Sequence, residues 1–113
     1  MYGRDFIIES DARLKENVRP IRNALETVLQ LRGVEYNFIS DEDKIDHLGF
    51  IAQEIEPILP QLVYPLPDSD KKGLDYQGFI PVLVEAMQEQ QKMLTQQAEQ
   101  IKALQAEIEA LKQ

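Results

Sequence analysis

The sequence predicts an α+β protein in which a small head of short strands and helices precedes one long C-terminal helix. In the first 78 residues, short apolar runs alternate with turn-forming Pro, Gly and Asp residues, which is typical of short elements. From residue 79 onward the apolar residues recur every seven positions, and no Gly or Pro follows Pro81. The length of 113 residues leaves room for one small head beside this helix.

Residues 79–113 carry the a/d pattern of a coiled coil, and the other positions are mostly Gln, Glu, Lys and Ala. The a and d positions are Ile80, Leu83, Met87, Gln90, Leu94, Gln97, Ile101, Leu104, Ile108 and Leu111. At about 1.5 Å per residue the helix would be roughly 50 Å long, longer than the head is wide, so its apolar edge needs partner helices. Because these residue types favour three strands, we expect a parallel trimeric coiled coil.

Gln90 and Gln97 interrupt the apolar d positions. We interpret them as buried amides that hydrogen-bond between chains and fix the register and the number of strands, at some cost in stability. The alternative is one long helix that packs on its own head and keeps both amides at the surface. The length of the apolar edge, about five heptads, favours the oligomer.

The elements expected in the head follow its apolar runs and the Pro and Gly residues that end them. They are a strand at 5–9, a helix from Pro20 to Leu29 that Arg32 and Gly33 stop, a half-buried strand at 34–38, a short helix within 47–55, and an extended piece at 62–64. A polar loop at 65–72 follows, and residues 73–76 are expected to lead directly into the long helix.

Composition argues against several classes of function. Acidic residues outnumber basic residues by 20 to 12, the net charge is −8, and no basic patch stands out, so we expect neither a nucleic-acid nor a membrane partner. Cysteine is absent, and no run approaches the roughly 18 apolar residues of a membrane span. The acidic loop at 41–46 reads as a solvated connection, because it lacks the Gly and the terminal Glu of a calcium loop. We expect no metal and no cofactor.

Ser10 and Lys15, taken alone, read as a turn residue and a solvated charge. A series of longer segments is more specific. In chain order they are Ser10-Asp11-Ala12-Arg13-Leu14-Lys15-Glu16-Asn17-Val18-Arg19-Pro20-Ile21, Gly33-Val34-Glu35-Tyr36, His47-Leu48-Gly49-Phe50-Ile51-Ala52-Gln53-Glu54, Leu74-Asp75-Tyr76 and Val84-Glu85-Ala86. Together these segments resemble the chaperone-of-endosialidase family, the self-cleaving intramolecular chaperones at the C-termini of phage tail spikes and fibres. A related domain occurs in the myelin regulatory factor of animals.

The resemblance covers nearly all of the chain from Ser10 onward. It implies a domain that trimerises, helps an upstream triple-stranded β structure of the same polypeptide to fold in register, and then cuts itself off. It implies Ser10 as the nucleophile, Lys15 as the base and the bond from Glu9 to Ser10 as the scissile bond. The chain would then divide into an upstream remnant at 1–9, a head at 10–78 and a trimerisation helix at 79–113. A virion tail precursor, assembled in the host cytoplasm, is the implied setting.

Two other functions stay open. One is a structural trimer clamp that does not cleave, in which Ser10 and Lys15 are inert. The other is a module of a membrane-tethered regulator that cuts itself when it assembles.

Chemistry and geometry set two conditions on a Ser10–Lys15 pair. A lysine acts as a base only when neutral, and bringing a lysine pKa from about 10.4 to about 7 takes about 4 kcal/mol. We therefore expect Lys15 to be buried, and the simplest way to bury it late is for the trimer to close over it. Five residues of helix would turn the two side chains about 140° apart, so Ser10 must lie outside any helix that contains Lys15.

Other residues near the motifs are candidates for supporting roles. His47 is a candidate donor to an oxyanion, although a structural hydrogen bond is the expected role. Asp11 and Arg13 are expected to pair with each other or across a subunit contact, and Asn17 is a further candidate. The core is expected to contain Phe50, Ile51, Ile55, Leu74 and Tyr76.

Overall fold

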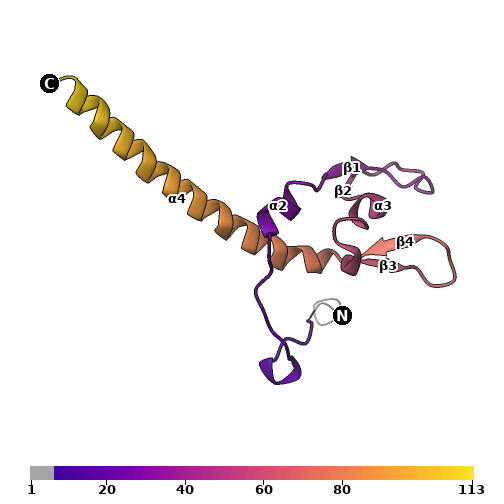
Figure 1. The fold of residues 1–113 in the computed structure, drawn as a ribbon. Coiled ribbons are helices and arrows are strands. Elements are labelled where there is room, and N and C mark those ends of the chain that lie inside the picture. The colour runs from indigo at the N-terminus through magenta and orange to yellow at the C-terminus, as the bar shows by residue number, and fades with distance from the viewer. Residues whose placement is uncertain (1–6) are drawn as a thin grey trace.

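The computed structural model describes residues 7–113 and places a head of short elements at the base of one long helix (Figure 1). In chain order the head contains the 3-10 turn η1 (Ala12–Leu14), α2 (Ala24–Val28), β1 (Val34–Tyr36), β2 (His47–Gly49), α3 (Ala52–Ile55), η2 (Pro60–Leu62), β3 (Val63–Pro65), β4 (Lys72–Leu74) and η3 (Tyr76–Gly78). The helix α4 (Phe79–Leu111) follows. The α+β class and the long C-terminal helix are confirmed, and the described molecule measures 74 × 43 × 30 Å because α4 projects from the head.

The strands form two antiparallel hairpins. β1 pairs with β2, with Tyr36 opposite His47, and β3 pairs with β4, with Val63 opposite Leu74. The expected half-buried strand is present as β1, although it ends at Tyr36 and does not reach residue 38. Each strand has three residues, so neither hairpin is stable alone and each depends on the neighbouring helices.

Two small buried clusters hold the head against the base of α4. One cluster contains Ile55, Leu59, Leu62 and Phe79, and the other contains Ala24, Val82 and Ala86. The second cluster lies where α2 crosses α4 (Figure 1). Of the expected core residues, Ile55 is buried, Phe50 and Leu74 are half-buried against the first cluster, and Ile51 and Tyr76 stay exposed.

Glu89 of α4 determines where α2 begins. Asn23 precedes α2 with a left-handed φ of 55° and provides no side-chain cap. The Glu89 carboxylate instead accepts hydrogen bonds from the backbone N–H groups of Ala24 and Leu25, at 3.2 and 3.1 Å. The expectation of a helix from Pro20 was therefore wrong at its start, because a left-handed residue breaks the helix and the cap comes from a residue distant in sequence.

Two other expectations about the head were wrong. Ile7 and Ile8 belong to no strand and are exposed, since no neighbouring strand pairs with them in the described chain; Phe6 lies outside the described residues. Residues 72–74 form β4, a strand that was not expected between the polar loop and the long helix. A three-residue strand carries too little periodicity to be recognised, and its partner β3 lies across a loop.

The head covers only the base of α4. Phe79, Val82 and Ala86 are buried, and Glu89 is half-buried. From Gln90 to Leu111 every residue is exposed, so within residues 7–113 nothing packs on this part of the helix. The buried positions are c and g of the heptad pattern, and the a and d positions remain uncovered along the whole length of α4.

Gly49 lies in β2 and allows this strand to approach the start of α4. The Tyr76 hydroxyl accepts a hydrogen bond from the backbone N–H of Phe50 at 3.1 Å and occupies the space where a side chain on residue 49 would lie. Phe50 also stacks on Phe79, with ring centroids 4.7 Å apart. The Gly49-Phe50 pair and Tyr76, which belong to separate motifs of the sequence, thus form one packing unit.

Replacing Gly49 with Ala should lower the free energy of unfolding by about 1–3 kcal/mol, because the new methyl group collides with the Tyr76 hydroxyl. Gly33→Ala is the matched control, since nothing lies within 4 Å of the position of its new methyl group, and it should change stability by less than about 0.5 kcal/mol. Chemical denaturation at one fixed protein concentration measures both. Equal stability of the two variants would contradict this packing.

Candidate active site

Ser10 and Lys15 lie on an arm, defined here as residues 7–22, that precedes α2. Every residue of the arm is exposed. In Figure 1 the arm descends from α2 and lies apart from the β1–β2 hairpin. Its hydrogen bonds join only residues that are close in sequence. The arm therefore has local structure but no hydrogen bond to the rest of the described chain.

The arm brings Ser10 and Lys15 into direct contact. The Lys15 ammonium donates a hydrogen bond from Nζ to Ser10 Oγ at 2.8 Å. Ser10 precedes η1 and Lys15 caps its C-terminal end with extended dihedral angles, so the short turn bends the chain between them. This geometry agrees with the requirement that Ser10 lie outside any helix that contains Lys15. Both residues are exposed, so the environment that a neutral lysine requires is not supplied by the described chain alone.

Asp11 holds the turn that separates Ser10 from Lys15. Its carboxylate accepts hydrogen bonds from the Arg13 backbone N–H at 2.8 Å and from Arg13 Nη2 at 2.7 Å. The Arg13 side chain, and then its backbone N–H, lower the pKa of the Asp11 carboxyl below its ordinary value. The expected local pairing of Asp11 with Arg13 is therefore present. Its role is to shape the turn, since neither residue contacts Ser10 Oγ through a hydrogen bond in the described chain.

In the described chain, neither His47 nor Asn17 forms a hydrogen bond with Ser10 or Lys15. His47 is in β2, where its ring stacks on Tyr36 with centroids 5.5 Å apart and meets the edge of Phe38 at 5.0 Å. Asn17 has a left-handed φ of 55°, and its carbonyl accepts a hydrogen bond from Arg19 Nη1 at 2.9 Å. The structure thus gives His47 a packing role in the hairpin and Asn17 a role in turning the arm.

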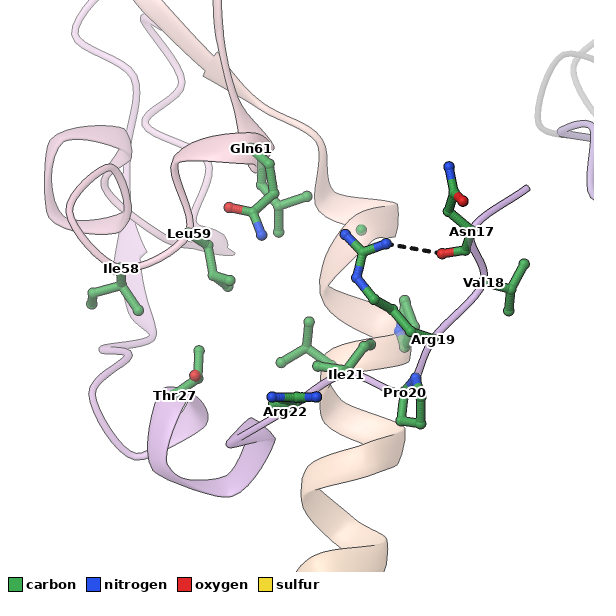
Figure 2. Close-up of a pocket in the computed structure, with 14 residues that line it drawn as sticks. Asn17, Val18, Arg19, Pro20, Ile21, Arg22, Thr27, Ile58, Leu59 and Gln61 are labelled. Carbon is green, nitrogen blue, oxygen red and sulfur yellow. Dashed lines mark hydrogen bonds between the residues drawn. The ribbon is translucent and has the colours of Figure 1, made fainter. Parts of the chain in front are cut away.

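The second half of the arm lines a groove at the base of α4, a role that sequence reasoning missed. Residues 17–22 share this groove of about 910 Å³ with η2 and with Pro81 and Val82 of α4 (Figure 2). Ile21 lies on the groove side, and Val18 points away from the head (Figure 2). The available sequence signal for this role was Pro20, because proline suits an extended chain as well as the first turn of a helix. The expectation of a helix start at Pro20 took only the second of these possibilities into account.

The acidic loop between β1 and β2 is a turn held by the Asp41 side chain. The Asp41 carboxylate accepts hydrogen bonds from the N–H groups of Asp43 and Ile45, at 3.0 and 3.2 Å. Within residues 7–113 no three His, Asp or Glu side chains gather as metal ligands. The described helices include none that is long and apolar enough to cross a membrane.

Comparison with known proteins defines the class of protein to which this arm and head belong. Residues 10–64 match the family model described as chaperone of endosialidase, a peptidase family, and the match begins at Ser10. Through this segment the chain belongs to the chaperone-of-endosialidase family.

The chain is similar to parts of much longer proteins. The long tail fiber protein Gp37 of Enterobacteria phage K3 is 38% identical over 86 residues, which cover 71% of this chain and 7% of that protein. Gp37 of Salmonella phage S16 is 30% identical over 112 residues, covering 92% of this chain and 15% of that protein. Myelin regulatory factor homolog 1 of Caenorhabditis elegans is 37% identical over 78 residues, which cover 60% of this chain and 8% of that protein. The chain spans a small fraction of the length of each relative.

Removing the Arg13 side chain should raise the pKa of the Asp11 carboxyl toward its ordinary value, because its strongest hydrogen-bond donor is lost. The pair stabilises the turn at pH values above about 4, where an unpaired Asp is ionised, and this stabilisation is lost as the pH falls through the lowered pKa of Asp11. Carboxyl NMR titration of Arg13→Ala measures the shift. Glu54, whose pKa is lowered by Arg32, is the internal control and should not change. An unchanged Asp11 titration would contradict the pairing.

Proposed function

We propose that this chain is a C-terminal intramolecular chaperone that trimerises an upstream fibrous tail protein and then releases itself by autoproteolysis between Glu9 and Ser10. The contact of 2.8 Å between Ser10 Oγ and Lys15 Nζ is the observation that carries the proposal, because a serine next to a lysine is a known nucleophile and base arrangement. The family match begins at this serine, and the tail-fiber relatives supply the class of passenger.

Trimerisation would occur through the a and d positions of α4. Met87 is 71% exposed and Leu94 53% exposed in the single chain, and their apolar neighbours along this edge are similarly exposed. Burying half of such a side chain contributes on the order of 1 kcal/mol, and eight apolar residues occupy this edge in each chain. Gln90 and Gln97 would lie in the same edge and fix the register and the number of strands by amide hydrogen bonds between copies.

The proposed cleavage is an attack by Ser10 on the carbonyl group that precedes it. Neutral Lys15 takes the proton of the Ser10 hydroxyl, and Oγ forms a bond to the carbonyl carbon of Glu9 through a five-membered ring. The bond from this carbon to the Ser10 nitrogen breaks, and the nitrogen receives the proton from Lys15. Water then hydrolyses the resulting ester. The products are a new C-terminal carboxylate on the main chain of Glu9, a free N-terminal amine on Ser10 and the restored Ser10 hydroxyl.

Assembly would supply the condition that Lys15 lacks in the single chain. In the single chain the Lys15 side chain is exposed to water. Enclosure by neighbouring copies would remove water from Lys15 and favour its neutral form. Cleavage would then follow assembly, and a chain that had not trimerised would stay uncut.

A regulator that cuts itself on assembly is a second candidate, because the chain is also similar to Myelin regulatory factor homolog 1. The tail-fiber relatives align over more of this chain, 71% and 92% against 60%, and we therefore favour the fibre chaperone. A trimer clamp that never cleaves is the remaining rival, and the cleavage experiment separates it from both.

Replacing Lys15 with Met should abolish self-cleavage of the full-length protein, because the methionine side chain has a similar length and no proton acceptor of comparable strength. The trimer should persist, since Lys15 is not part of the α4 edge. Intact mass and N-terminal sequencing detect cleavage as a new terminus at Ser10, and sedimentation reports the trimer.

Lys71→Met is the matched control for this substitution. Its side chain is 79% exposed in the loop between β3 and β4, remote in sequence from the arm, so the variant should cleave at the wild-type rate. A Lys15→Met protein that still acquires a Ser10 terminus would refute the assignment of Lys15 as the base. A wild-type trimer that stays intact would instead support the clamp.

A further inference from the structure

The described part of the chain does not provide the support that a catalytic pair on the arm needs. No arm residue is buried, and among residues 7–113 no hydrogen bond of the arm joins residues more than five positions apart. Catalytic side chains have to be held within about 0.5 Å of their working geometry by a packed surrounding. For Ser10 and Lys15, that surrounding must therefore come from outside the described residues.

The heptad positions of α4 indicate where a neighbouring copy would lie. The head occupies the c and g positions, through Val82 and Ala86 among others. The arm lies on the other flank, where residues 18–21 share a second groove with Ile80 and Val84 at a and e positions and with Pro81 and Glu85 at b and f positions. At about 100° per residue, the uncovered a and d edge lies between these two flanks.

In a parallel coiled coil the e side of each helix adjoins the g side of its neighbour. The arm lies on the e side of α4 and the head on the g side, so the arm of one copy faces the head of the next. We propose that the arm docks through Val18 and Ile21 on the head of a neighbouring copy, beside its α2, and that this contact holds the Ser10–Lys15 pair in place. This inference rests on the proposed parallel trimer and adds the surface through which assembly controls cutting.

The surface of the arm fits an apolar partner of this kind. Val18 is 81% exposed and points away from its own head (Figure 2), and Ile21 is 39% exposed. The groove that they share with α4 has a volume of about 710 Å³ and is continuous with the proposed trimer edge, because Ile80 belongs to both. A neighbouring copy that covers Ile80 therefore lies next to this groove, which identifies the occupant as a second copy of this chain.

Hydrogen exchange of the uncleaved full-length trimer tests the docking without relying on activity. In Ser10→Ala protein, the amides of residues 10–22 should exchange about tenfold or more slowly than in the same protein with Val18→Ser added. The amides of α4 should remain equally protected in both. Arm amides that exchange freely in the Ser10→Ala trimer, or equally in the two proteins, would overturn the proposal.

Cleavage by proteins with native Ser10 gives the second readout. Val18→Ser and Ile21→Ser should still sediment as trimers and should cut about tenfold or more slowly, because the catalytic pair is no longer held. Ile39→Ser is the matched control, since Ile39 is 97% exposed in the β1–β2 loop, and it should cut normally. Trimeric Val18→Ser protein that cuts at the wild-type rate would refute the docking alone, whereas a monomeric wild type would refute the proposed trimer itself.

Discussion

The structure depends on an apolar edge of α4 that the described chain leaves in water. Along Gln90 to Leu111 this edge carries most of the large apolar side chains of the helix, and no part of residues 7–113 packs on it. Apolar surface contributes about 25 cal/mol for each Å² that is removed from water, which drives association of such edges. The head uses the c and g side at the base of the helix, so its packing leaves this edge free.

The small core of the head gives the proposed assembly a role in stability as well. Seven buried hydrophobic residues hold the described head, and both hairpins consist of three-residue strands. A fold of this size gains little from its own interior, and binding to copies of itself adds to its stability by mass action. The Ser10–Lys15 contact is created by a local turn that Asp11 and Arg13 stabilise, and the arm that carries it stays exposed in the single chain. In the proposed function, folding, assembly and cutting would thereby be linked through one helix.

The sequence was sufficient to predict features that repeat over many residues and features that follow from local backbone geometry. The long helix was predictable because its period is sustained, and the bend between Ser10 and Lys15 followed from helix geometry. The start of α2 was not predictable, because Glu89, which lies far along the chain, provides its cap. The strand β4 depends on pairing across a loop, and the position of the arm beside α4 depends on tertiary packing. Such contacts between distant residues leave little signal in a local pattern.

Sedimentation equilibrium of the uncleaved Ser10→Ala protein over a wide range of concentrations tests the central claim most directly. If the free edge of α4 is a trimer interface, this chain should sediment with three times its mass of 13.0 kDa, and its head should be folded in that state. A single folded chain of 13.0 kDa that persists at high concentration would contradict the account, because the apolar edge would then be stable in water without a partner.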